Sequence, residues 1–466
     1  MFLRGRTPSN HPAATPKGVS PFSTNRDPAV QPPQRWASGS CLKPDKESLM
    51  GSITRRGMLA ATAAGSALTA RTVLAQEKQP EPVRGNKGAT DLGPRNVAAD
   101  SDNPDLLAPP ATDAGDLPNL KWPFSLSHNR LLEGGWARQT TVRELPVSQA
   151  MAGVNMRLLP GAIRELHWHK ENEWSLMLNG SARVTCVDEE GRNFVADIRQ
   201  GDLWYFPSGL PHSIQALDKG CEFLLVFDNG SFSEDSTFLI SQWFAHLPRE
   251  VLAKNFTTSE STFEQIPKEQ LYIFKAPVPG SLASDTVSSP AGQVPNPFVF
   301  RMMDMPPIKC SGGSVRIVDS KIFKASENIA AAYIEIDPGG MRELHWHPRS
   351  PEWQYYISGR ARMTVFGSGE NSRTFDYQAG DVGYVPQSMG HHIENIGNEP
   401  VQYLEMLVGP RYNDVSLEQW LALVSPELVK QHLRLDDSFI RDLHKKKQFV
   451  VKATAPAPRS PPPQQG

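Results

Sequence analysis

The sequence predicts an all-β protein with peripheral helices, built from two similar barrels or sandwiches in tandem. The first observation is an internal repeat, in which Pro160-Gly-Ala-Ile-Arg-Glu-Leu-His-Trp-His169 recurs as Pro338-Gly-Gly-Met-Arg-Glu-Leu-His-Trp-His347. The second is a series of short alternating stretches bounded by turn residues, among them 183–187, 222–226 and 362–366. The third is a length of 466 residues, which is too long for one ordinary core.

The repeat continues downstream of these two segments. His345 lies 178 residues after His167, whereas Glu352 lies 179 residues after Glu173, because the second copy has one extra residue in between. A Gly-Asp pair at 201–202 recurs at 380–381, and His212 recurs as His391. Such coincident order predicts two copies of one domain.

Composition divides the chain into seven segments, bounded by changes in proline, glycine and apolar content. Apolar residues recur at helical spacing in 239–252 and 417–433, so helices are expected after the strands of each copy. The segments are a disordered leader (1–49), which is not translated if Met50 is the start, a signal peptide (50–75), an N-terminal arm (76–120), the first barrel (121–274), a linker (275–300), the second barrel with C-terminal helices (301–448), and a disordered proline-rich tail (449–466).

The signal peptide is predicted from paired arginines before a short, mildly apolar run. Arg55-Arg56 precede residues 60–70, and Val73-Leu-Ala75 offers small residues for cleavage, as in bacterial twin-arginine signals. This predicts export to the periplasm or secretion, with Met50 as a possible true start. The alternative is a chance Arg-Arg pair in a disordered leader.

Charge and cysteine content exclude several classes of protein. With 48 basic and 50 acidic residues the net charge is -2, which gives no electrostatic reason to expect nucleic acid or a membrane as partner. The cysteines show no CxxC spacing, so free buried thiols are expected and neither a zinc ribbon nor a disulfide framework is supported. A Cys186–Cys221 bridge stays open on spacing alone. The four cysteines are Cys41, Cys186, Cys221 and Cys310.

The repeated histidines predict a metal site in each copy. On a strand, residues two apart point to the same face, so His167 and His169 project together. An acid beyond the turn and a histidine from a later strand complete a set of three imidazoles and one carboxylate, which suits manganese or iron better than structural zinc. The two sets are His167, His169, Glu173, His212 and His345, His347, Glu352, His391.

Other histidines and two arginines require separate interpretation. His392 is expected on the opposite strand face, and the histidines at 128, 246 and 444 are interpreted as non-catalytic. Arg164 and Arg342 lie three residues before their first histidine, so strict alternation turns them away from the metal. A bend at the preceding Pro-Gly brings them round to clamp a carboxylate; a surface salt bridge with the adjacent glutamate is the alternative.

The copies differ in their nearby acids. The repeat offset places Val226 where the second copy has Glu405, and only the first copy is followed by a Ser-Glu-Asp-Ser-Thr stretch, within 228–237, suited to a mobile lid. This difference predicts that one site performs the chemistry and the other assists or stabilises.

These stretches resemble the bicupins, and specifically the bacterial and fungal oxalate decarboxylases. The resemblance runs from about residue 95 to about 448 and rests on Arg164–His169, Gly201–His212 and Gly380–Pro386, together with the lid. It implies two tandem cupin (double-stranded β-helix, or jelly-roll) barrels. It also implies a homo-oligomer, a trimer or a dimer of trimers.

The resemblance further implies an enzyme that splits oxalate into formate and carbon dioxide, with two Mn²⁺ per chain and dioxygen as a cofactor. Catalysis is expected at the first site, where Glu234 on the lid donates and accepts the proton and Arg164 holds oxalate. Glu405 and Arg342 are expected to serve the second site in an auxiliary role. Members of the family also occur with Asn at the position of Asp235.

Two alternative functions and the role of two tryptophans stay open. An oxalate oxidase on the same scaffold releases hydrogen peroxide, and a lid carrying Glu234 favours the decarboxylase. A non-enzymatic storage or binding bicupin is disfavoured because both ligand sets are complete. Trp168 and Trp346 are expected to face outward, where they pack between barrels or subunits or pass electrons between metal sites.

Overall fold

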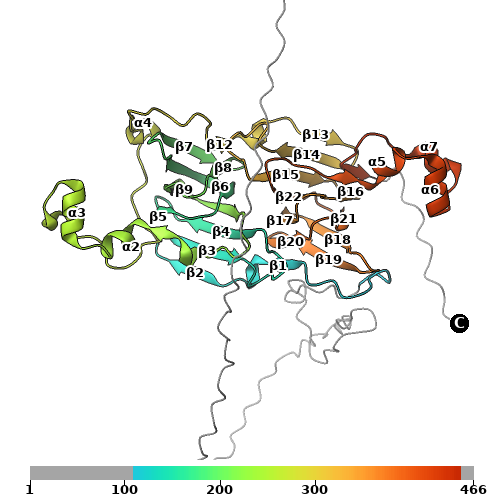
Figure 1. Cartoon of the computed structure of the whole chain (residues 1–466), viewed down its shortest axis with the longest axis horizontal. Helices are drawn as coiled ribbons and strands as arrows, with labels where there is room; N and C mark the ends of the chain where they lie inside the picture. The colour runs from blue at the N-terminus through green and yellow to red at the C-terminus, as the bar shows by residue number, and fades with distance from the viewer. Residues whose placement is uncertain (1–108, 453–466) are drawn as a thin grey trace, which may run out of the picture. The chain divides into compact units, whose positions relative to one another are not determined.

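The computed structural model describes residues 109–452, which are mainly strands with helices at the periphery (Figure 1). This confirms the predicted fold class. The leader, the signal peptide, the arm up to residue 108 and the tail beyond 452 lie outside the described residues. All named strand pairs are antiparallel, as expected for barrels built from short alternating segments.

The first barrel is one 11-stranded sheet. Its central order is β12-β8-β6-β9-β4-β3-β2, with β5 beside β9 and β7 beside β6. Its strands are β2 (Asn129–Leu132), β3 (Gly135–Thr140), β4 (Ala152–Leu158), β5 (Ile163–Trp168), β6 (Glu173–Val187), β7 (Asn193–Arg199), β8 (Leu203–Phe206), β9 (His212–Phe227), β10 (Phe238–Leu239), β11 (Ile273–Phe274) and β12 (Val299–Phe300).

The second barrel comprises a 7-stranded and a 6-stranded sheet. The larger sheet contains β1 (Lys121–Pro123), β13 (Ile308–Cys310), β14 (Gly313–Val318), β15 (Ile329–Ile336), β17 (Glu352–Ser358), β20 (Asp381–Val385) and β22 (Val401–Val408). The smaller one contains β16 (Gly340–Trp346), β18 (Arg360–Phe366), β19 (Ser372–Gln378), β21 (Gly390–Asn395), β23 (Val415–Ser416) and β24 (Val450–Lys452).

Glycine makes the corner between the two walls of each barrel. In the first barrel the continuous strands β6 and β9 bend where Gly180 has a φ of +73°, and a Cβ there would lie 2.0 Å from the Gly220 carbonyl oxygen. The equivalent Gly359, with a φ of +80°, separates β17 from β18. Only glycine accepts both this backbone conformation and this close approach, which explains the repeated glycine.

Three predicted segment boundaries are wrong, because edge strands cross between the two barrels. β1 begins the predicted first barrel but pairs with β20 of the second, and β12 ends the predicted linker but pairs with β8 of the first. β24 lies in the predicted tail but pairs with β16. Each of these strands forms backbone hydrogen bonds with an edge strand of a sheet. Such pairing joins residues far apart in the chain, so the local sequence does not reveal it.

Ion pairs accompany the crossing strands, and the one between Lys121 and Asp381 is buried. The Lys121 ammonium lies 3.0 Å from Asp381, and Arg301 pairs with Asp202. Both acids come from the repeated Gly-Asp motif, so each barrel uses that aspartate to hold the segment that precedes the other barrel. The linker also packs: the Arg183 guanidinium donates to the Gly280 carbonyl at 3.1 Å.

The predicted helical segments are each divided in two. The first contains α2 (Ile240–Ala245) and α3 (Arg249–Phe256), and the second contains α5 (Leu417–Ala422) and α6 (Pro426–Leu433). Pro248 and Pro426 stand at the breaks, because proline lacks the N–H that a continuous helix needs. The other α-helices among residues 109–452 are α4 (Leu282–Asp285) and α7 (Asp437–Asp442). α2 and α3 project from the first barrel and α5 to α7 from the second (Figure 1).

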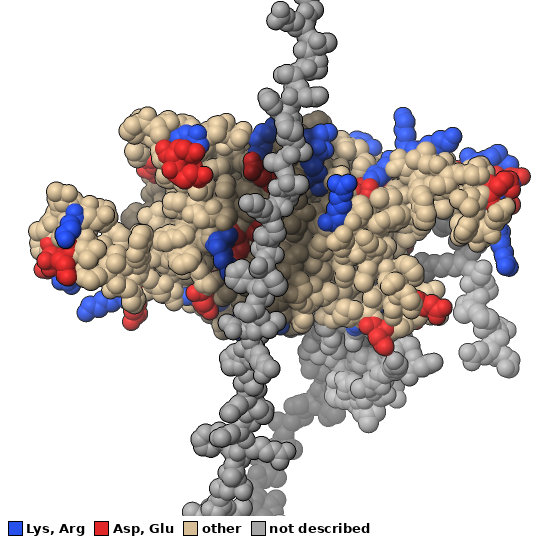
Figure 2. Space-filling view, viewed as in Figure 1, with Lys and Arg blue, Asp and Glu red and all other residues tan. Residues whose placement is uncertain are grey.

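Side chains of both charges occur over the face shown in Figure 2. None of the helices between residues 109 and 452 is long and apolar enough to cross a membrane. Cys186, Cys221 and Cys310 are free, the first two buried, as predicted. Cys41 lies outside the described residues.

Candidate metal centres

The first four predicted ligands meet inside the first barrel. His167 is the last residue but one of β5, His169 directly follows the strand, Glu173 begins β6 and His212 begins β9. The four side chains are buried, and one potential ligand atom from each lies within 4.8 Å of the others. His167 and His212 are direct cross-strand partners, with ring centroids 4.2 Å apart. The second set forms an equivalent cluster in the second barrel.

A β-bulge places an arginine on the same face as the histidines. In the ladder between β5 and β9, Arg164 pairs with Ile214 but His167 pairs with His212, so one extra residue lies on β5 between them. Because of this extra residue, Arg164 and His167 no longer alternate strictly along the strand, and both side chains line a single pocket. β16 has the same shift between Arg342 and His345.

Backbone carbonyls orient the imidazoles. In the first barrel, Nδ1 of His167, His169 and His212 lies 2.5, 2.8 and 2.8 Å from the carbonyl oxygens of residues 165, 171 and 210. In the second, the corresponding distances for His345, His347 and His391 are 2.7, 2.9 and 3.0 Å. A proton on Nδ1 that donates to a carbonyl leaves the Nε2 lone pair for a metal, which is the usual outer-shell arrangement of a ligating histidine.

The donor atoms fit a divalent cation. Nε2 of His345 is buried without a hydrogen-bond partner among the described residues, and Nε2 of His212 and of His347 has only the carboxylate of its own cluster beside it. Such orphaned polar atoms are rare in folded proteins, and a metal ion would satisfy them. Burial, followed by the nearby Arg164 guanidinium, lowers the pKa of His167 well below its usual value, so the imidazole is neutral as ligation requires.

The carboxylate ligands are held ionised. Burial alone raises the pKa of Glu173, but hydrogen bonds from His169 and His212 outweigh it and hold the pKa well below its usual value. Glu352 behaves likewise, with Nε2 of His391 only 2.7 Å and Nε2 of His347 2.9 Å from its Oε2. Three nitrogens, one anionic oxygen and no thiolate suit manganese or iron. The residues therefore fit the predicted ion.

A small pocket lies over the first cluster. Glu234, in a one-turn 3-10 helix of the segment predicted to form a lid (residues 228–237), reaches it together with Arg164 and Tyr272. Phe227 and Phe232 stack on one another with ring centroids 3.6 Å apart and form an apolar wall. The cavity volume is about 10 Å³, which is room for about one water molecule. A molecule larger than water can enter only if the residues that line the pocket move.

Glu234 lies in a setting that favours its neutral form. Burial raises the pKa of Glu234, and the Tyr272 hydroxyl and the Arg164 guanidinium only partly oppose this rise. Its Oε1 is buried without a hydrogen-bond partner among the described residues. The Glu234 carboxyl therefore faces the pocket and has few polar neighbours.

Tyr272 is a pocket residue that the sequence analysis missed. Its backbone has a φ of +54°, its N–H donates to Glu165 at 2.8 Å, and its ring lies 4.0 Å from the Arg164 guanidinium carbon. Phe449 occupies the equivalent place in the second barrel, with a φ of +58° and an N–H that donates to Glu343. An aromatic residue thus recurs in both copies, 177 positions apart, and this repeat is the sequence signal that could have identified Tyr272.

The structure corrects the predicted counterpart of Glu405. Glu173 pairs with Phe227 and Glu352 pairs with Leu407, so Glu405 corresponds to the residue two before Phe227. That residue is Leu225, which lines the first pocket, and not Val226 as the repeat offset indicated. The second copy has one further extra residue before the point that corresponds to the end of β9. The repeat offset therefore no longer aligned the two copies there.

At the second site, Arg342 and Glu405 form a buried ion pair, and both have further hydrogen-bond partners. Arg342 Nε donates to Glu405 at 3.0 Å, and its Nη2 donates to Tyr412 at 3.1 Å and to Asp414 at 2.5 Å. Tyr403 also donates to Glu405 at 2.7 Å, and Tyr412 does so as well. By contrast, among residues 109–452 no carboxylate lies within ion-pair distance of Arg164, so the alternative pairing with Glu165 is excluded.

The remaining predictions concern outward-facing residues. Trp168 meets Trp243 of α2 edge-on at 5.4 Å, and Trp346 meets Trp420 of α5 edge-on at 5.7 Å, so each packs against the helices that follow its own barrel. His392 and the histidines at 128, 246 and 444 belong to neither cluster.

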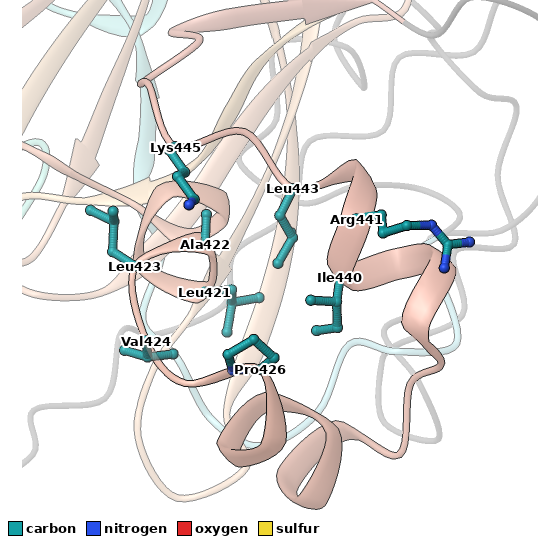
Figure 3. Close-up of a pocket in the computed structure, with 9 residues that line it drawn as sticks. All are labelled: Leu421, Ala422, Leu423, Val424, Pro426, Ile440, Arg441, Leu443 and Lys445. Carbon is teal, nitrogen blue, oxygen red and sulfur yellow. The ribbon is translucent and has the colours of Figure 1, made fainter.

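A larger cavity of about 520 Å³ lies among α5, α6 and α7, away from both clusters. Leu421, Ile440 and Leu443 point toward one another there (Figure 3). The cavity contains no ligating set, so it is not a candidate metal centre.

Known proteins match both halves of the chain. The cupin family model matches residues 126–264 and 303–441. The oxalate decarboxylase OxdC of Bacillus subtilis is 58% identical over 377 residues, which cover 81% of this chain and 98% of that protein. An oxalate decarboxylase of Arthroderma benhamiae is 38% identical over 424 residues, covering 85% and 99%.

Solved structures agree with this result. The Bacillus subtilis oxalate decarboxylase at pH 4.6 superposes with a TM-score of 0.77 at 58% identity, covering 80% of this chain and 98% of the other. Another structure of that enzyme was used to assign its Mn(II) centres, and a further one replaces a Ser-Glu-Asn-Ser stretch. With complete ligand sets in both barrels, this chain belongs to the cupin family and, within it, to the bicupin oxalate decarboxylases.

Proposed function

We propose that this protein converts oxalate to formate and carbon dioxide at its first metal centre, with manganese and dioxygen as cofactors. One observation carries the proposal: Arg164, without a carboxylate partner, and Glu234 line one pocket over the first ligand cluster. An unpaired guanidinium in a buried pocket is suited to bind a small dicarboxylate. The relatives named oxalate decarboxylase support the same substrate.

Each ligand cluster would hold one Mn²⁺, giving two per chain. When bound, manganese together with dioxygen supplies a reversible one-electron oxidation, which weakens the carbon–carbon bond of oxalate. The contributions of the chain itself are binding, proton transfer and exclusion of water.

Arg164 binds and orients the substrate. Its guanidinium can donate two parallel hydrogen bonds to one carboxylate, which fixes the plane of oxalate in the pocket. The Tyr272 carbonyl oxygen accepts a hydrogen bond from Arg164 Nη1 at 3.4 Å, and its ring stacks on the guanidinium. Arg164 is therefore preorganised before oxalate enters.

Glu234 moves the proton. The carboxylate accepts the proton of the oxalate monoanion, carbon dioxide leaves, and the same proton is delivered to the remaining carbon to give formate. Atoms and charge balance, since the hydrogen oxalate anion becomes carbon dioxide and the formate anion. A raised pKa brings Glu234 nearer to the pH at which a group can both accept and donate.

Apolar side chains protect the reaction from water. Leu225, Phe227 and Phe232 line the pocket opposite the polar groups. Excluding water strengthens the electrostatic action of Arg164 and prevents protonation by solvent at the wrong step. The pairing of Arg342 with Glu405 leaves no comparable binding group at the second site, which is proposed as auxiliary or structural.

Two further properties belong to the proposal. Large apolar side chains are exposed on both helical extensions, including Trp243 at 53% and Trp420 at 52%, and such surfaces favour assembly into a homo-oligomer, a trimer or hexamer. The paired arginines at 55–56 support export by the twin-arginine route to the periplasm or medium. Sedimentation of the purified protein and cell fractionation test these two points.

The decisive experiment is turnover of oxalate with and without dioxygen, with formate, hydrogen peroxide and bound metal measured on the same sample. The proposal predicts stoichiometric formate, little peroxide, loss of turnover without dioxygen and up to two manganese ions per chain. Peroxide as the main product identifies an oxalate oxidase instead. No consumption of oxalate by manganese-loaded protein overturns the proposal.

A further inference from the structure

One charged residue outside the metal cluster touches the lid. Arg130 on β2 donates from Nη1 to Asp235 Oδ1 at 3.4 Å, and Asp235 directly follows Glu234. The Arg130 guanidinium also lies over the Tyr272 ring at 3.9 Å. A single side chain thus contacts both the lid and the aromatic residue against which Glu234 rests.

The second barrel shows that the fold itself does not need this arginine. Arg130 pairs with Ala137 across β2 and β3, and the corresponding pair on β13 and β14 is Ile308 with Val315, each 178 residues later. An apolar side chain therefore supports the same strand pair in the copy that lacks the lid glutamate. The pairing of these two strands therefore does not itself require an arginine at position 130.

The lid partner of Arg130 is also distinctive. The Bacillus subtilis enzyme has a Ser-Glu-Asn-Ser stretch, whereas this chain has Ser-Glu-Asp-Ser at 233–236. Asn carries no charge, so an ion pair with Arg130 is available only to the Asp235 side chain. The acid is 84% exposed and Arg130 22% exposed, so the pair is accessible to salt and breaks easily.

A weak contact is suited to a lid that must open in every turnover. The closed pocket has no room for oxalate, so substrate entry and product release require Glu234 to leave its place. An ion pair at the lid shifts the balance between open and closed forms without locking it. We propose that Arg130 is a lid-positioning residue, whose ion pair with Asp235 favours the closed lid and keeps Glu234 over the first metal centre.

The first test measures lid opening and does not depend on activity. A glutamate-specific protease cleaves the 234–235 bond only when the lid is open, and mass spectrometry quantifies this cleavage in the manganese-loaded protein. Arg130→Gln is expected to accelerate cleavage by about two- to fivefold, the range of an exposed ion pair. Added salt is expected to accelerate cleavage of the wild type but not of the variant.

Arg157→Gln is the matched control, because Arg157 forms an exposed pair with Glu222 at 3.8 Å in the same barrel. Arg130→Lys, which keeps the charge, should restore part of the protection. The proposal is overturned if Arg130→Gln and Arg157→Gln are cleaved at the same rate at both low and high salt.

The second test rests on the proposed function and uses Asp235→Asn. A lid that closes less often leaves the reaction without its proton donor, so the ratio of peroxide to formate should rise about two- to fivefold and lose its dependence on salt. In the Arg130→Gln background, Asp235→Asn should cause no further change. An unchanged ratio in both single variants contradicts the role of the pair. If the wild type makes no formate, the proposed function fails, while the cleavage test still decides the contact.

Discussion

Arg164 and His167 face the same pocket although they are three positions apart along one strand. The cause is the bulge on β5, where the pairing with β9 moves by one residue between Arg164 and His167. Strict alternation would have turned the guanidinium toward the outside of the barrel. One inserted residue therefore brings the Arg164 guanidinium next to the predicted metal ligands.

Replacing Arg164 with Lys should separate charge from geometry. Lysine keeps the positive charge but lacks the planar fork that binds both carboxylate oxygens. We expect kcat/KM for oxalate to fall about 100-fold, in line with the loss of one preorganised donor at a reacting group. Manganese content, measured by elemental analysis, should be unchanged, and a variant with wild-type kcat/KM would exclude the clamp.

Replacing the equivalent arginines of the two barrels, Arg164 and Arg342, should have different effects on activity and stability. Arg342→Met leaves the buried Glu405 without its cation, whereas Asp414 keeps its ion pair with Lys447, so the free energy of unfolding should fall by about 3–5 kcal/mol. Arg164→Met, the matched control, removes a guanidinium that no carboxylate pairs with, and should cost activity with little loss of stability. Chemical denaturation measures both; equal destabilisation of the two variants would contradict the assignment.

Tyr272→Phe should preserve the fold and impair the reaction. Phe449 performs the same backbone role in the second barrel, so the ring alone satisfies the scaffold. Loss of the hydroxyl beside Glu234 should lower kcat about tenfold, close to the effect of one hydrogen bond. Unchanged kcat at unchanged thermal stability would show that the hydroxyl has no part in positioning the proton donor.

The raised pKa of Glu234 predicts a pH-dependent stability. Burial raises the folded-state pKa above the usual 4.5, so the folded protein binds a proton that the unfolded chain has lost. Stability from this group is complete below the unfolded pKa and is lost as pH rises through the folded pKa. Glu234→Gln should therefore raise the melting temperature at pH 7 but not at pH 4. The opposite order would mean that Glu234 is ionised and stabilised in the fold.

Much of the metal site could be predicted from the sequence. The His-x-His spacing on a strand, the acid beyond the turn and a repeat of both fix the ligands locally. The bulge, Tyr272 and the crossing strands β1 and β12 depend on contacts between residues far apart in the chain, such as Tyr272 with Glu165. Leu225 was missed because a second length difference between the copies is invisible without the register of β9.

The central claim is that catalysis takes place at the first metal centre with Glu234 as the proton carrier. It is tested most directly by formate production from oxalate in Glu234→Ala, with both metal sites filled to the wild-type level. We expect formate production to be nearly abolished, because Leu225 stands where the second site has an acid and no other described carboxylate without a metal-ligand role lines the pocket. Formate production at the wild-type rate in this variant would contradict the claim.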